Sequence, residues 1–132
     1  MQKTNIDEDS ERSPATPHVI KSVSKFDEYI GSVDTAAPVV IQFTAPWCRR
    51  CTTLKQEIAD TFDLSLHWIT VDVDEITALQ ERFNVTQLPR LDVYCSGRTD
   101  SVESFDAKVD VLIRMLQAAT SERPKLELLD DF

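Results

Sequence analysis

A Cys-x-x-Cys pair at the step from a strand-like run into a helix-like run constrains this chain more than any other feature. The pair is Cys48 and Cys51, inside the pentapeptide WCRRC. The nearly continuous apolar run 39–44 before it predicts a strand with both faces covered, and residues 48–62 predict a helix. Two cysteines with this spacing can close a small disulfide ring and open it again, so the pattern indicates thiol–disulfide chemistry.

Length and charge narrow the class of protein further. The 132 residues suffice for one domain of ordinary size. The net charge of −9, from 14 basic and 23 acidic residues, argues against binding to nucleic acids or anionic membranes. The sequence contains no run of about 18 apolar residues, so it predicts no transmembrane helix.

The start of the chain and its cysteine count bear on the compartment. Residues 1–10 are polar and acidic, without the basic start and apolar stretch of a secretory signal or the basic composition of a mitochondrial transit peptide. Three cysteines are too few for a secreted disulfide scaffold. We therefore expect an intracellular protein in a reducing compartment, in the cytoplasm or in an organelle.

The chain divides into a central domain and two tails. Residues 1–17 are predicted to form a flexible N-terminal tail, 18–120 the domain, and 121–132 a flexible acidic C-terminal tail. Pro124 is expected to break the last helix. An alternative for the second tail is a short docking segment, because four apolar residues could cover a groove: Leu126, Leu128, Leu129 and Phe132.

Strand and helix patterns alternate between the tails. The predicted strands are 18–21, 39–44, 67–73, 91–95 and 101–105, the last two joined by a turn at 96–97. The predicted helices are 25–33 capped by Ser24, 48–62, a short helix capped by Asp74, and 108–119. This β-α-β-α-β-α-β-β-α order predicts an α/β fold with a central mixed β-sheet flanked by helices on both faces.

The order of elements and the WCRRC site together resemble the thioredoxin family over residues 18–119. A second motif, VTQLP at 85–89, is similar to the family segment that ends in a cis-proline facing the disulfide. The resemblance implies a thioredoxin-like fold and disulfide exchange on proteins. It also implies a cis bond between Leu88 and Pro89, which would leave the Leu88 backbone open to an extended substrate. Trp47 would add an apolar contact surface; the alternatives are a trans Pro89 at a strand start and ordinary packing of Trp47.

Several positions depart from the family pattern. Arg49 and Arg50 stand where Gly-Pro is usual, and Gln42 stands where the family has a buried aspartate below the cysteines. Three further family positions are a lysine near that aspartate, a proline in the second helix and a glycine beside the site. They correspond here to Thr70, Gln56 and Asp106.

Cys48 is the predicted nucleophile, because unpaired N–H groups and the dipole at a helix start favour a thiolate. Arg49 and Arg50 add two positive charges within one turn, so we expect a lowered Cys48 pKa and a more oxidising disulfide. Cys51 is the predicted resolving thiol. Gln42 cannot take its proton, which predicts slow resolution unless water reaches the site.

Other polar residues in this region admit more than one interpretation. Arg90 is expected to approach Arg49 and Arg50 in a basic rim suited to an anionic partner, with solvated surface charge as the alternative. Asp92 needs a partner that the sequence does not identify. Cys95 is expected to be a small buried residue. The cysteine pair itself could be inert or hold zinc. Zinc needs four ligands, however, and the remaining candidates are Cys95, His18 and His67, with no second Cys-x-x-Cys in the sequence.

The sequence therefore predicts an enzyme, a thioredoxin-like protein-disulfide oxidoreductase. We expect no bound cofactor, since the sequence lacks a glycine-rich nucleotide loop, and no metal. Its expected partners are disulfide-containing proteins and a separate reductase or small thiol as electron donor. Two alternatives remain open. One is a glutathione-dependent, glutaredoxin-like enzyme, and the other is a protein-binding module with weak or regulatory redox activity.

Overall fold

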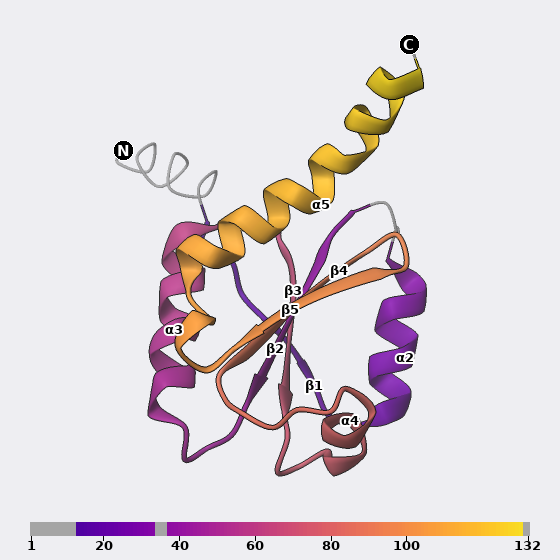
Figure 1. The fold of residues 1–132 in the computed structure, drawn as a ribbon. Helices are drawn as coiled ribbons and strands as arrows, with labels where there is room; N and C mark the ends of the chain where they lie inside the picture. The colour runs from indigo at the N-terminus through magenta and orange to yellow at the C-terminus, as the bar shows by residue number, and fades with distance from the viewer. Residues whose placement is uncertain (1–12, 34–36, 131–132) are drawn as a thin grey trace, which may run out of the picture.

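In the described part of the chain, five strands form one mixed sheet in the order β1-β3-β2-β4-β5 (Figure 1). The structure is a computed structural model and describes residues 13–33 and 37–130, with side chains as far as Thr120. β1, β3 and β2 run parallel, whereas β4 is antiparallel to β2 and β5. The strands are β1 (His18–Ile20), β2 (Val39–Thr44), β3 (His67–Asp72), β4 (Arg90–Cys95) and β5 (Arg98–Glu103).

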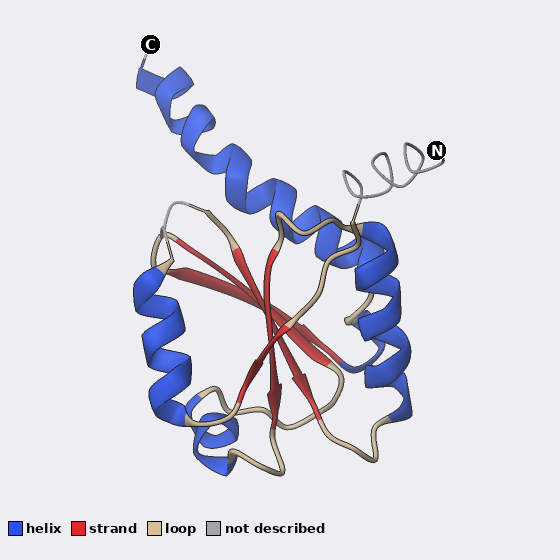
Figure 2. Ribbon diagram, turned by 180° about the vertical axis from the view of Figure 1, so that it is seen from behind, coloured by secondary structure: helices blue, strands red, loops and turns tan. Residues whose placement is uncertain are grey.

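Helices cover both faces of this sheet (Figure 2). α2 (Val23–Ser32) and α4 (Thr77–Arg82) lie on one face, and α3 (Arg49–Thr61) and α5 (Val109–Asp130) lie on the other. A short 3-10 helix, η1 (Ser104–Asp106), connects β5 to α5. The predicted order of strands and helices and the mixed α/β architecture are confirmed.

The two core layers follow from the alternation of side chains along β2. Ile41 and Phe43 pack in the layer that includes α2 and α4, whereas Val40 packs in the layer that includes α3 and α5. Because successive strand residues point to opposite faces, Gln42 lies on the α3 face with Val40. β2 is buried on both faces, and it carries the chain directly to the cysteine pair.

Helix α2 begins earlier than the sequence pattern predicts. Ser22 caps it in place of the predicted Ser24, and the Ser22 hydroxyl accepts the Lys25 N–H at 3.1 Å. Both serines suit a cap locally, but Ser22 has the extended backbone that an N-cap requires. Asp27, three residues after Ser24, pairs instead with Arg82 of α4 at 2.9 Å.

Helix α4 is not capped by Asp74, contrary to the prediction. The helix begins at Thr77, and Ile76 at its N-cap makes no side-chain hydrogen bond to it. Asp72 instead orders the turn after β3, because its Oδ1 accepts the N–H groups of Asp74 at 2.9 Å and of Glu75 at 3.3 Å. The Asp74 carboxylate is therefore left to contact the cysteine site.

The β4–β5 hairpin is tighter than predicted. β5 begins at Arg98, three residues before the predicted strand 101–105. Ser96 and Gly97 have φ angles of 53° and 81°. Two successive residues with positive φ form the short turn whose twist matches paired strands, so pairing resumes at once with Cys95 opposite Arg98.

The domain begins before the predicted boundary at residue 18. Ala15, inside the predicted N-terminal tail, is buried, and its N–H donates to Phe62 O at 3.0 Å. Pro14 forms an isolated bridge with Asp63, so this short segment is attached to the end of α3. Residues 1–12 of the predicted tail lie outside the described residues.

At the other end, the last helix does not stop near Ala119. α5 continues through Pro124 to Asp130, contrary to the predicted break. The proline removes one helical hydrogen bond, but its fixed φ is compatible with a helix. The flexibility of the C-terminal segment stays a prediction, and the side chains of the proposed docking segment lie outside the described ones. None of the helices within the described ranges is both long and apolar enough to span a bilayer.

Candidate active site

Cys48 and Cys51 form a disulfide just past the end of β2, with their Cα atoms 5.3 Å apart. Cys48 is the N-cap of α3, and Cys51 lies in the first turn of that helix. Both cysteines are buried, Cys48 at 6% exposure and Cys51 at 0%. The predicted intramolecular pairing is confirmed, and Cys48 is the more exposed of the two residues.

The start of α3 provides a hydrogen-bond donor to the Cys48 sulfur. The Cys51 N–H donates to Cys48 Sγ at 3.2 Å. This N–H belongs to the first turn of the helix, where backbone donors have no partner within the helix. When the disulfide is reduced, the same donor and the helix dipole favour the anionic form of Cys48.

The two arginines between the cysteines have different surroundings. The Arg50 guanidinium extends to η1, where Nη2 donates to Ser104 O at 3.3 Å and Cζ lies 4.6 Å from the centre of the Phe105 ring. Arg49 is exposed, and within the described part of the chain its side chain makes no hydrogen bond or ion pair. Part of the Arg50 charge is therefore directed toward η1, and Arg49 keeps a solvated charge.

Arg90 does not join Arg49 and Arg50 in a basic rim. It forms a bidentate pair with Asp92, at 2.8 Å from Nε to Oδ1 and 3.2 Å from Nη2 to Oδ2, and its Nη1 donates to Asn84 O at 3.2 Å. Residues two apart in a strand share a face, so the R-x-D spacing in β4 could have identified the partner that Asp92 requires.

Burial raises the pKa of the Asp92 carboxyl above its usual value. The hydrogen bonds and charge of Arg90 oppose this rise, and the nearby charge of Glu103 adds to it. Asp92 is fully buried and the Arg90 side chain is 13% exposed. This ion pair lies within β4, one residue beyond Pro89, and holds the turn at Asn84 against the sheet.

Gln42 connects β2 to the first turn of α3. Its Nε2 donates to Cys51 O at 3.1 Å, and its side chain is fully buried. Its Oε1 has no hydrogen-bond partner among the described residues. An amide in this position orients the cysteine turn but cannot accept a proton near neutral pH.

Trp47 is held in place by Asp74, the residue that the sequence pattern predicts as a helix cap. The Trp47 Nε1–H donates to Asp74 Oδ2 at 3.0 Å, while 69% of the tryptophan surface stays exposed. The acidic residue two positions after β3 was the available signal for this contact. The indole thus forms a fixed apolar surface immediately before Cys48.

The bond between Leu88 and Pro89 is cis, as the resemblance implied. Pro89 is buried, and its carbonyl accepts the Ser104 N–H at 2.8 Å. Ser104 has φ of 60°, a left-handed conformation that glycine adopts more readily than serine. Asp106 was matched to a family glycine, but the left-handed residue of this segment is Ser104.

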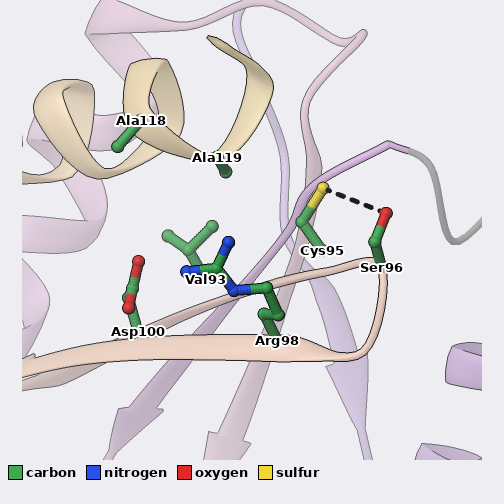
Figure 3. Close-up of a pocket in the computed structure, with 7 residues that line it drawn as sticks. All are labelled: Val93, Cys95, Ser96, Arg98, Asp100, Ala118 and Ala119. Carbon is green, nitrogen blue, oxygen red and sulfur yellow. Dashed lines mark hydrogen bonds between the residues drawn. The ribbon is translucent and has the colours of Figure 1, made fainter. Parts of the chain in front are cut away.

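The third cysteine lies at the other end of the sheet. Cys95 ends β4 beside the hairpin turn, whereas Cys48 follows the far end of the neighbouring strand β2. Cys95 is buried, as predicted, and its Sγ lies 4.0 Å from Ser96 Oγ (Figure 3). It lines a small cavity of about 150 Å³ between the hairpin and α5, at the opposite end of the sheet from the disulfide.

Comparison with known proteins agrees with this geometry. A family model described as Thioredoxin matches residues 17–118. Thioredoxin H8 of Arabidopsis thaliana is 32% identical over 106 residues, which cover 76% of this chain and 70% of the plant protein. Thioredoxin-2 of Pyricularia oryzae is 26% identical over 112 residues, which cover 83% of this chain and 63% of the fungal protein.

A solved structure supports the fold independently. The thioredoxin NaTrxh from Nicotiana alata superimposes with a TM-score of 0.70 at 20% identity, over 80% of this chain and 94% of that one. The family match spans most of the domain and includes both the cysteine pair and the cis-proline. The chain belongs to the thioredoxin family of thiol–disulfide oxidoreductases.

Proposed function

We propose that this chain exchanges its Cys48–Cys51 dithiol and disulfide with disulfides of protein substrates. One observation carries the proposal: Cys48 Sγ accepts the Cys51 N–H at the start of α3 while it is bonded to a fully buried partner sulfur. An attacking sulfur that is stabilised as an anion, next to a shielded second thiol, is the arrangement that two-step disulfide exchange requires.

The reducing direction consumes two electrons from the dithiol. The Cys48 thiolate attacks one sulfur of the substrate disulfide, that bond breaks, and the departing substrate thiolate takes a proton from solvent. A mixed disulfide now joins Cys48 to the other substrate sulfur. The Cys51 thiolate then attacks Cys48 Sγ, releases the second substrate thiolate, and leaves the protein as the disulfide that the structure contains.

The second step requires Cys51 to lose its proton in a buried position. Gln42 contacts the Cys51 carbonyl and provides no titrating group. Phe43 O lies 3.9 Å from Cys51 Sγ and can accept a hydrogen bond from the thiol, but it cannot remove the proton. We therefore infer that water takes this proton, and that resolution is the slow step.

Trp47, Leu88 and Pro89 are proposed to contact the substrate. The exposed indole is immobilised by Asp74, and the cis peptide lies in the segment that packs against η1. Arg49, Arg50 and Gln42 are proposed to tune the thiol pKa values and the potential. Arg50 is expected to lower the Cys48 pKa less than Arg49 does, because the Arg50 guanidinium contacts Ser104 and Phe105.

The electrons are proposed to come from a separate reductase or a small thiol in an intracellular compartment. Glutathione as the thiol partner is a second candidate, favoured by the exposed and unengaged guanidinium of Arg49 in the described part of the site. Turnover with glutathione as sole reductant would support this candidate, whereas turnover only with a dithiol or a reductase would exclude it.

Three single variants test the assignment. Cys48→Ser should abolish reduction of a protein disulfide, and Cys51→Ser should accumulate a mixed disulfide detectable by mass spectrometry. Cys95→Ser is the matched control and should retain turnover, because Cys95 lies beyond the far end of β2. If mild oxidation left all three thiols titratable, or if Cys95→Ser lost activity while folded, the proposed roles would be wrong.

A further inference from the structure

A groove with one basic end lies beside the cysteine pair, between α3 and the η1–α5 segment. It encloses about 240 Å³. Its walls include Arg50, Leu54, Glu57, Pro89, Phe105 and Lys108. Pro89 and Arg50 connect the groove to the site described above, on the side that η1 covers.

The Phe105 ring is presented to solvent by the backbone beneath it. The side chain is 77% exposed, the highest exposure among the large apolar residues described. The preceding residue, Ser104, is held by two hydrogen bonds. Its N–H donates to Pro89 O, and its carbonyl accepts a hydrogen bond from Arg50 Nη2. Phe105 therefore stands on a segment attached to both the cis-proline and the cysteine helix, although its own side chain contributes little to the core.

Arg50 lies over this ring with hydrogen-bonding capacity to spare. Its Cζ is 4.6 Å from the ring centre, and a single bond of 3.3 Å to a neutral carbonyl is its described polar contact. A guanidinium has five N–H donors in a planar fork that matches a carboxylate. Stacking on Phe105 orients that fork and leaves donors available to a bound anion.

The charge of the groove changes sign along its length. Arg50, Thr53, Leu54 and Glu57 lie on one face of α3. Glu57 is two helical turns beyond Arg50, a separation of about 10 Å along the axis. Past Glu57 the surface continues with Asp60 and Asp110, among which Lys108 is the basic side chain. The net charge of these side chains is therefore positive at the end next to Cys48 and negative at the other end, where Lys108 offsets one of three carboxylates.

We propose that this groove selects substrate proteins that carry an acidic side chain within two residues of the cysteine attacked by Cys48. The carboxylate pairs with Arg50, and the stem of the acidic side chain lies against Phe105. This inference rests on the proposed disulfide exchange and assigns a substrate class to it. Charge complementarity identifies the occupant as an extended segment of a partner protein that carries its acidic residue beside the cysteine and none at the far end of the groove.

The position of the acidic residue follows from the charge gradient. An extended segment advances about 3.3 Å per residue, so three residues span about 10 Å. An acidic residue near the cysteine meets Arg50, whereas one three residues further out meets Glu57 and is repelled. The groove thus distinguishes two substrates of equal net charge by the placement of that charge.

The test uses symmetric peptide dimers joined by a single disulfide, so that either sulfur has the same flanking sequence. In the two near peptides, Glu or Gln stands two residues from the cysteine, both before and after it. In the two far peptides, Glu or Gln stands five residues from the cysteine in the same way. The reduced protein is mixed with excess dimer, and the released peptide thiol is quantified after acid quenching. No electron donor is needed, so donor specificity does not enter the rate.

We expect the near-Glu peptide dimer to be reduced about three- to fivefold faster than the near-Gln dimer at low salt. This ratio corresponds to the free energy of an exposed ion pair. This preference should shrink as salt is added. Far Glu should react no faster than far Gln. Arg50→Gln should bring the near Glu to near Gln ratio to one, and the ratio is informative even if the variant also changes the Cys48 pKa. Arg114→Gln, an equal charge change on the exposed face of α5, should keep the native ratio.

The results separate the two proposals. If all four peptides react at equal rates, or if far Glu is preferred, acid selection by the groove is refuted while disulfide exchange stands. An equal loss of preference in Arg114→Gln would also refute it, because net charge and not the groove would be responsible. If no peptide reacts, the proposed function fails and this inference fails with it.

Discussion

Breaking the ion pair between Arg90 and Asp92 by removing one partner should be among the most destabilising single changes in this domain. Replacing Arg90 with Met keeps most of the side-chain volume but leaves a fully buried carboxylate without its cation. Breaking a buried pair by removing one partner costs about 3–5 kcal/mol. Since the Arg90 side chain retains 13% exposure, we expect a loss near the lower end, about 3 kcal/mol at neutral pH.

A double-mutant cycle separates the pair from its desolvation. Asp92→Leu alone leaves the guanidinium without a carboxylate and should also destabilise. The double variant Arg90→Met/Asp92→Leu replaces both charges with apolar groups, and such replacements are often neutral or stabilising. We expect it to unfold within about 1 kcal/mol of the native protein, so the two single changes should be strongly non-additive.

The cost of Arg90→Met should depend on pH in a defined direction. Burial holds the folded pKa of Asp92 above the usual 3.8, so the folded state binds more protons than the unfolded state just above that pH. The contribution of this group to the free energy of unfolding therefore falls as pH rises through that window. Without Arg90 the folded pKa of Asp92 rises further, so this pH range extends to higher pH. Acidification should therefore recover part of the lost stability, because a protonated Asp92 needs no cation.

Urea unfolding of the oxidised proteins, followed by tryptophan fluorescence and circular dichroism at several pH values, measures these free energies. The disulfide is kept closed in every variant so that its contribution cancels. If Arg90→Met lost less than about 1 kcal/mol at neutral pH, or lost the same amount at every pH, the account of a buried and ionised Asp92 would be wrong.

Two further predictions concern the cysteine chemistry. Gln42→Asp should accelerate resolution of the Cys48 mixed disulfide by about tenfold or more, because a positioned base contributes about 10²–10⁴-fold in rate. An unchanged single-turnover rate in the folded variant would show that water already removes the Cys51 proton. Replacing Arg49-Arg50 with Gly-Pro should raise the Cys48 pKa and make the potential more negative. A rise of about one unit in the Cys48 pKa corresponds to about 1.4 kcal/mol, or to a shift of about 30 mV in the reduction potential. Thiolate absorbance measures the pKa, and equilibration with glutathione measures the potential. An equal or lower Cys48 pKa would show that neither guanidinium acts on the sulfur.

Much of the fold and the centre of the site could be predicted from sequence because both are encoded locally. A buried run such as 39–44, followed by a cysteine pair and a helical pattern, specifies strand, turn and helix within about twenty residues. The cysteine spacing places Cys51 in the first helical turn, where its N–H meets the Cys48 sulfur. The segment before Pro89 was identified by resemblance to a family, and not by propensity.

The partners of Trp47 and Arg50 were decided only by the tertiary structure. Asp74 reaches Trp47 across 27 residues, and Ser104 reaches Arg50 across 54. Such contacts depend on which strands are neighbours and in what register, which no local pattern specifies. The Arg90–Asp92 pair is local in sequence, yet its importance arises from burial, because the folded chain excludes the water that would otherwise solvate both charges. The sequence by itself determined the redox pair and the order of elements; the packing of distant segments determined where each charge points, because burial and strand register exist only once the chain is folded.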